Sequence, residues 1–193
     1  MAHLEDYFLN RVRGWRMAAF LVAPVAWFQI VLLFSGLYQT YTLAQSGPPL
    51  EETPFFSAGI AVERLGAIAD AGRTDTAYLF YVADFVSAIL LAAALAALIA
   101  FGLRAAHAAG GKLRHVVLLP LGVIVAELAE NALLAVALAT YPDFPPLLGT
   151  AAGIATGLKF VLIVPSALLA LGGLVVGGLL SAKRVLAIGQ RDE

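Results

Sequence analysis

The sequence of 193 residues contains no cysteine. This absence excludes disulfide bonds, thiolate metal ligands and cysteine nucleophiles. Charged residues are also scarce, at 13% of the chain, whereas soluble proteins average roughly 25%. Hydrophobic residues make up 61% and the mean hydropathy is +0.89. Because a soluble domain of this size cannot bury so much apolar surface, the composition predicts an integral membrane protein whose first partner is the lipid bilayer.

The chain also has almost no net charge and few histidines, and both facts exclude certain classes of function. The net charge is −1, so no overall field favours nucleic acid, and no nucleic-acid partner is expected. The three histidines, His3, His107 and His115, all fall in segments expected on one side of the membrane. This placement argues against haem ligation and against a carboxylate–histidine di-iron site. No P-loop, dinucleotide fingerprint or serine–histidine elbow is present, so we expect no metal and no cofactor.

Four hydrophobic runs are long enough to cross the roughly 30 Å of a bilayer's hydrocarbon core. They cover residues of about 17–43, 77–103, 116–139 and 148–180. None shows the strict alternation of a barrel strand, so helices are favoured. The first run is too long for a typical signal peptide and is expected to be a retained helix. The sequence therefore predicts an all-α fold, a four-helix transmembrane bundle forming a single domain over residues 1–193.

The basic residues are distributed unevenly along the loops. Lys and Arg gather in the N-terminal segment, the second loop and the C-terminal tail, whereas the first and third loops are acidic on balance. Positive charge near spans predicts the cytoplasmic side, so both termini are expected to be cytoplasmic. This bias, with the abundance of Ala and Gly, predicts location in a bacterial cytoplasmic (inner) membrane.

The first loop, residues 44–76, is the longest and should lie on the outer side. Thr53 and Pro54 fit an N-cap followed by a first-turn proline. After them, apolar residues recur on one helical face, which predicts a short amphipathic helix from Phe55 to Ala71. It would rest on the outer interface or cap the bundle. The alternative is an irregular loop that packs its own apolar residues inward.

The third run contains polar residues where an apolar residue such as leucine is expected in a membrane-spanning helix. They lie in the stretch AELAENALL, residues 126–134. Glu127, Glu130 and Asn131 are spaced three and four residues apart, so they share one helical face. A charge in mid-membrane costs at least about 2.5–3.5 kcal/mol. This face must therefore point into the bundle, at a partner or into a water-filled cavity.

Two other runs supply partners at a similar depth. Asp84, with Tyr81 one turn away, and Lys159 lie within roughly one helical turn of the depth of Glu130. We expect a polar cup in the outer half of the membrane, and its candidate ligand- or ion-binding residues are Asp84, Glu127, Glu130, Asn131, Lys159 and Tyr81. Three carboxylates face one lysine, so we expect carboxyl protonation or a bound cation.

The leading hypothesis is a membrane protein that binds a small ligand or ion in this cup and carries out proton- or cation-coupled transport. As a transporter it would act as a homo-oligomer, since four spans are few for alternating access. The structural alternative is a lysine–carboxylate pair that only fixes helix register.

Two other functional classes stay open. One is a non-catalytic accessory or assembly subunit, which binds a membrane-protein partner through the outer first loop and through glycines of the fourth run; these are Gly172, Gly173, Gly177 and Gly178. The other is an enzyme that modifies a lipid or isoprenoid, with a cup carboxylate as general acid.

Overall fold

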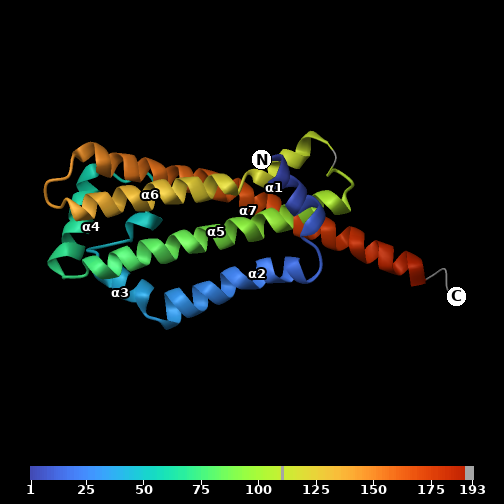
Figure 1. Cartoon of the computed structure of the whole chain (residues 1–193), viewed down its shortest axis with the longest axis horizontal. Helices are drawn as coiled ribbons and strands as arrows, with labels where there is room; N and C mark the ends of the chain where they lie inside the picture. The colour runs from blue at the N-terminus through green and yellow to red at the C-terminus, as the bar shows by residue number, and fades with distance from the viewer. Residues whose placement is uncertain (110, 190–193) are drawn as a thin grey trace.

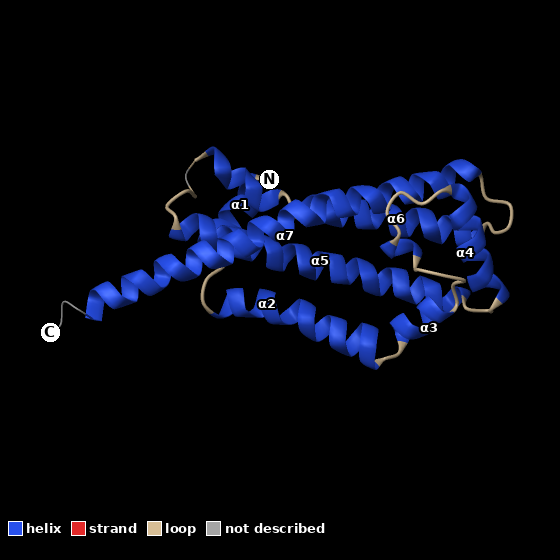
Figure 2. Cartoon of the chain, turned by 180° about the vertical axis from the view of Figure 1, so that it is seen from behind, coloured by secondary structure: helices blue, strands red, loops and turns tan. Residues whose placement is uncertain are grey.

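The computed structural model describes residues 1–109 and 111–189, with side chains left aside for Ala2, Leu32 and residues 184–189. All regular structure in these residues is helical, so the predicted all-α class is confirmed (Figures 1 and 2). The α-helices are α1 (Ala2–Asp6), α2 (Trp15–Trp27), α3 (Leu37–Leu43), α4 (Ala58–Asp70), α5 (Thr74–Ala105), α6 (Leu121–Ala139) and α7 (Pro146–Gly189). Two π-helical segments, η1 (Tyr7–Arg11) and η2 (Phe28–Phe34), and two 3-10 segments, η3 (Leu50–Glu52) and η4 (Lys112–Leu118), complete the order.

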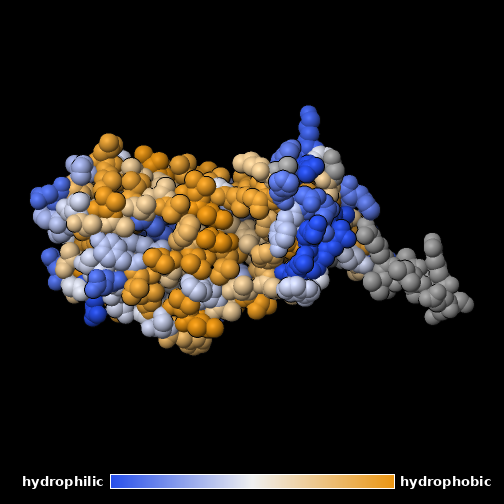
Figure 3. All heavy atoms as spheres, in the orientation of Figure 1, coloured by the Kyte–Doolittle hydropathy of each residue, from blue (hydrophilic) through white to orange (hydrophobic). Residues whose placement is uncertain are grey.

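Within the described residues, three helices are long and apolar enough to cross a membrane: Thr74–Ala105, Lys112–Ala139 and Pro146–Lys183. They pack side by side as the body of the bundle (Figure 1). The space-filling view shows apolar side chains over the middle of one face and polar ones toward both ends (Figure 3). This distribution is the one expected of a bundle whose middle lies in lipid.

The first predicted span is not one helix. After α2, the segment η2 widens to π-helical turns, and the chain breaks at Ser35 and Gly36 before α3. Gly36 has φ of 74°, a left-handed conformation that favours glycine, and the Ser35 hydroxyl accepts the Leu37 N–H at 3.1 Å. The prediction of an unbroken helix over 17–43 is therefore wrong, because apolar composition does not reveal a left-handed stop.

A second break lies near the N-terminus. The segment His3–Arg11 meets Trp15–Val31 at an angle of 106°, with Gly14 at φ 53° in the bend. If this bent pair is counted as one span, up to four segments of the described chain are long and apolar enough to cross a membrane. Phe8 and Leu9 of the bent segment are buried, and their carbonyls accept hydrogen bonds from Arg104 at 2.8 and 3.4 Å. The segment thus folds across one end of the bundle.

The opposite end of the bundle is capped by α4. Its true N-cap is Ser57, whose hydroxyl accepts from the Ile60 N–H at 3.4 Å, so the predicted start at Thr53 and Pro54 is wrong. The cause is tertiary: the Phe55 N–H donates to the Gly153 carbonyl of α7 at 3.0 Å, which holds this stretch outside the helix. The amphipathic character is confirmed, since Leu65 and Ile68 are fully buried, and α4 packs against α5, α6 and α7.

The glycines of α7 contact another helix of the same chain. A Cβ atom on Gly173 would lie 2.5 Å from the Leu98 carbonyl oxygen of α5, and one on Gly177 would lie 2.3 Å from the Phe101 ring. Gly172 and Gly178 have open space instead. Two of the four glycines predicted for a partner surface therefore serve close packing of α5 and α7.

Candidate functional site

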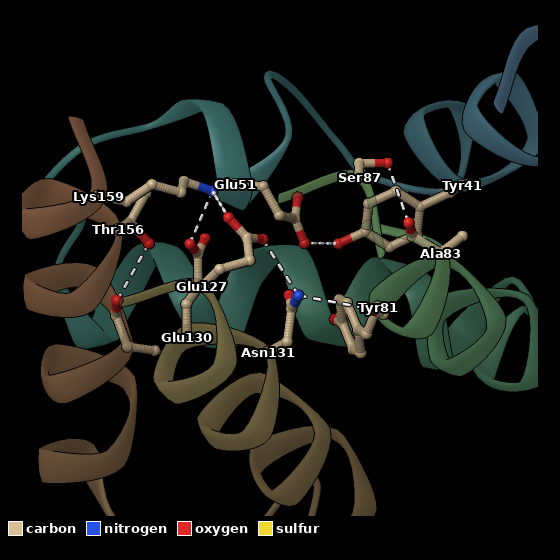
Figure 4. A network of polar contacts seen from close by, with 11 residues as sticks. Tyr41, Glu51, Tyr81, Ala83, Ser87, Glu127, Glu130, Asn131, Thr156 and Lys159 are labelled. Carbon is tan, nitrogen blue, oxygen red and sulfur yellow. Dashed lines mark hydrogen bonds and ion pairs between the residues drawn. The ribbon is translucent and has the colours of Figure 1, made fainter. Parts of the chain in front are cut away.

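The centre of the candidate site is a buried ion cluster between α6 and α7 (Figure 4). The Lys159 Nζ lies 2.8 Å from Glu130 Oε2 and 3.3 Å from Glu127 Oε2. We call these three residues the central cluster. Asn131 extends it, because its Nδ2 donates to Glu127 Oε1 at 3.1 Å and to the Tyr81 carbonyl at 3.2 Å. Three helices, α5, α6 and α7, are thus joined by polar contacts deep in the bundle.

The predicted polar face of α6 is confirmed. Glu127, Glu130 and Asn131 are 3%, 0% and 6% exposed, whereas Leu128 is 53% exposed. Helical spacing alone places the three polar groups on the inner side, since residues three and four apart share one face. The exposed leucine shows that α6 keeps its apolar side outward.

Glu51 joins this site, and sequence reasoning missed it. It lies in η3 of the outer loop, only 5% exposed, and its Oε1 accepts a hydrogen bond from the Tyr41 hydroxyl (Figure 4). Burial raises the pKa of the Glu51 carboxyl to about 7, although the Tyr41 hydrogen bond acts in the opposite direction. Glu52, its neighbour, is exposed. No local signal separates the two; only the adjacent apolar Leu50, which is fully buried, hints that this stretch turns inward.

Two glycines of α7 allow the outer loop to reach this position. A Cβ atom on Gly153 would lie 2.0 Å from the Phe56 carbonyl oxygen, and one on Gly157 would lie 2.1 Å from the Phe55 ring. Phe55 itself has φ of 58°, which is uncommon for a non-glycine residue. The loop therefore lies directly against the α7 backbone within the two turns before Lys159, and this contact keeps Glu51 beside the cluster.

A cavity of about 580 Å³ begins at this polar group and runs between α2, η2, α5, α6 and α7. Its polar lining residues are Gln29, Glu51, Asp84, Ser87, Glu127 and Lys159. Farther along, the lining is apolar and includes Leu21, Leu95, Leu98, Val123 and Ile163. From Asp84 to Leu98 the wall follows α5 for fourteen residues, or about 21 Å at the usual helical rise. The cavity is thus acidic at one end and apolar along the rest.

All six predicted site residues lie together in the structure. Asp84 lines the cavity, and its carboxyl group interacts with that of Glu127. Tyr81 is buried, packs edge-on against Tyr41 at 5.8 Å and offers its carbonyl to Asn131. Whether these residues bind anything stays a prediction.

The charges of the site do not balance. Within the described residues, the carboxylates of Glu51, Asp84, Glu127 and Glu130 face the single ammonium of Lys159, which leaves −3 if all are ionised. Three buried acceptor atoms have no hydrogen-bond donor among those residues: Glu51 Oε2, Glu130 Oε1 and Asn131 Oδ1. Each such group costs about 1–3 kcal/mol. A pair kept only for helix register needs neither the surplus nor the unpartnered atoms.

The donor set does not form a metal site. In the part of the chain that the structure describes, no three His, Asp or Glu side chains lie close enough to hold a metal ion. The carboxylates are instead spread around the polar end of the cavity. Their arrangement suits protons or a molecule with polar hydrogens.

No family model matches the chain, and no curated protein or solved structure is significantly similar to it. The function is therefore argued from the site.

Proposed function

We propose that this is an integral membrane protein that binds a small amphiphilic ligand in the cavity between α2 and the body of the bundle. The observation that carries the proposal is the division of the cavity lining, with carboxylates at one end and, along α5 from Ala88 to Leu98, about 15 Å of apolar wall beyond them. A ligand with a polar head and an apolar tail matches that division. Ligand pockets are commonly mostly apolar with a few placed polar groups.

The positive-inside bias supports a topology for this proposal. With the bent N-terminal pair as the first of four spans, both termini are cytoplasmic in a bacterial inner membrane. The carboxylate end of the cavity then lies in the outer half of the membrane. The apolar end extends into the cytoplasmic half, where it accepts the tail.

Access from the bilayer is supported by the exposure of α2 and η2. Val25 and Phe28 line the cavity and are nevertheless 61% and 44% exposed. The indole N–H of Trp27 ties this stretch to α5, donating to the Ala83 carbonyl at 3.2 Å and to the Ser87 hydroxyl at 3.1 Å. A ligand dissolved in lipid can pass beside α2 without crossing water.

The surplus of carboxyl groups supports coupling to protons. In the empty site, protons on some of these carboxyls reduce the uncompensated negative charge. A bound ligand that supplies positive charge or hydrogen-bond donors takes over that role and releases protons. Coupled transport by an oligomer is an extension of this binding function.

The proposal is tested with a substitution whose side chain fills the apolar part of the cavity. Ala94, on α5, lines it and is 6% exposed, so Ala94→Trp should occupy the space of the tail. Ile89→Trp, on the same helix but outside the cavity lining and 39% exposed, is the matched control. Native mass spectrometry of the protein in nanodiscs, incubated with dodecylamine, dodecanol or dodecyl sulfate, measures bound probe. We expect one probe molecule per chain in the parent and in Ile89→Trp, and a large loss in Ala94→Trp.

Two results would count against the proposal. One is that none of the three probes binds the parent above the level of empty nanodiscs. The other is equal binding by a correctly folded Ala94→Trp variant, which would place the probe elsewhere on the protein.

A further inference from the structure

We infer that the head of the bound amphiphile is a single organic cation, an amine carried on an apolar tail. This inference rests on the proposed function and adds the chemical class of the ligand. It comes from the carboxylates that remain at the polar end of the cavity once Lys159 has been paired.

Lys159 is already engaged. Its ammonium group contacts Glu130 at 2.8 Å and Glu127 at 3.3 Å, and its side chain is 10% exposed. Among the described residues, Asp84 and Glu51 form no ion pair, although both line the cavity. Two carboxyl groups therefore face the cavity without a basic partner.

The sign of the head group follows from this surplus. A head carrying one positive charge reduces the net −3 of the ionised site, whereas an anionic head would increase it in a poorly solvated space. An ammonium group also brings two or three N–H donors, and Glu51 Oε2 has no donor within the described part of the chain. Charge and hydrogen bonding thus favour the same head.

The surroundings favour an organic cation over a bare metal ion. No group of three His, Asp or Glu side chains in the described residues can hold a metal. Two aromatic rings, Phe28 and Phe160, line the cavity, and aromatic faces attract ammonium groups. The Lys159 Nζ already lies 5.9 Å from the centroid of Phe160, so one ammonium group uses this ring in the structure.

Protons alone do not account for the site as a whole. They would neutralise Asp84 and Glu51 without using the apolar wall, which includes Leu95, Leu98 and Ile163. A cationic amphiphile uses both parts at once. Its charged nitrogen meets the carboxylates while its tail covers the apolar side chains.

The test compares heads on one tail. Dodecylamine, dodecanol and dodecyl sulfate, the last at low concentration, are titrated against the protein in nanodiscs of zwitterionic lipid, with empty nanodiscs subtracted. We expect the amine to bind at least about tenfold more tightly than the alcohol, and the sulfate to bind most weakly. In Asp84→Asn and Glu51→Gln the amine-to-alcohol ratio should fall toward one. Glu52→Gln, which changes an exposed carboxylate beside Glu51, should keep the parent ratio.

The outcomes separate the two proposals. If the alcohol or the sulfate binds as tightly as the amine in the parent, the inference of a cationic head group is wrong, whereas the proposal that the cavity binds an amphiphile still holds. If no probe binds the parent, the binding function fails and this inference fails with it. Because the parent ratio decides the question, a variant that does not fold leaves the test intact.

Discussion

Two ion clusters among the described residues differ in burial and in charge balance. In the terminal cluster, at the end of the bundle near the N-terminus, Glu5 contacts Arg114 at 2.9 Å and His115 at 2.7 Å; the Glu5 side chain is 6% exposed, but those of Arg114 and His115 are 37% and 69% exposed. In the central cluster, every side chain is at most 10% exposed. The terminal cluster has one carboxylate for two basic groups, whereas the central one has more carboxylates than bases.

This difference separates two uses of ion pairs. Near water, a pair costs little to keep and contributes little to stability. In the interior, each charge depends on its partner, and an excess of one sign lowers stability unless something else compensates it. The excess of negative charge therefore lies in the buried central cluster, where it lowers stability the most. Functional sites often show this pattern, since they are retained at the expense of stability.

The largest expected effect comes from removing the cation of the central cluster. Lys159→Met leaves Glu127 and Glu130 without a positive partner, and breaking a buried pair in this way costs roughly 3–5 kcal/mol. Equilibrium unfolding in mixed micelles at neutral pH measures the loss. Lys183→Met, an exposed lysine of the same helix, is the control and should change the free energy of unfolding little. Equal losses in the two variants would show that the ion pairs of Lys159 contribute no more to stability than an exposed lysine does.

The next effect concerns Glu51 and depends on pH. Its carboxyl has a pKa of about 7 in the folded protein, raised from 4.5 chiefly by burial. The folded state therefore holds a proton that the unfolded state has released, so stability falls as pH rises between these two values, by about 3 kcal/mol in all. Glu51→Gln should abolish this decline, as measured by unfolding at pH values across the window.

Glu52→Gln provides the matched control for that experiment. Its carboxylate is exposed and accepts a hydrogen bond from the Tyr38 hydroxyl at 2.6 Å. The variant should keep the pH dependence of the parent. A decline that persists unchanged in Glu51→Gln would show that another group of the site carries it.

The smallest effect is expected at the terminal cluster. The hydrogen bond from His115, together with Arg114, lowers the pKa of Glu5. The contribution of this carboxylate is present above its ordinary pKa and disappears as pH falls through the lowered value. Glu5→Gln should cause a minor loss at neutral pH that shrinks further at about 1 M salt, where charges are screened within about 3 Å.

Asp6→Asn, a change at the neighbouring exposed carboxylate, is the control for Glu5. Thermal unfolding at low and high salt suffices for the measurement. A loss in Glu5→Gln larger than that of Lys159→Met would reverse the order of the two clusters.

Much of the central cluster could be predicted from local pattern. The spacing of Glu127, Glu130 and Asn131 puts them on one face in any α-helix, and the cost of charge in lipid turns that face inward. The depths of Asp84 and Lys159 follow from the helical rise, because long apolar helices start near the membrane surface. Side chains on long, regular helices are predictable since few conformations are open to them.

The irregular parts could not be predicted in this way. The break at Gly36 and the delayed start of α4 depend on a left-handed residue and on a backbone hydrogen bond to α7, and neither leaves a trace in hydropathy. The sequence also does not predict that Gly173 and Gly177 face α5, because small residues suit contacts within a chain or between chains.

Composition and helical periodicity thus account for the helical class, the apolar spans and the inward polar face of α6. They do so because these properties depend on residues close together in the chain. The burial of Glu51, which adds a fourth carboxylate to the three predicted around Lys159, and the cavity beside α2 depend on segments far apart in the sequence. Only tertiary packing decides these, because Glu51 and Glu52 are chemically identical and differ only in which one lies beside the central cluster.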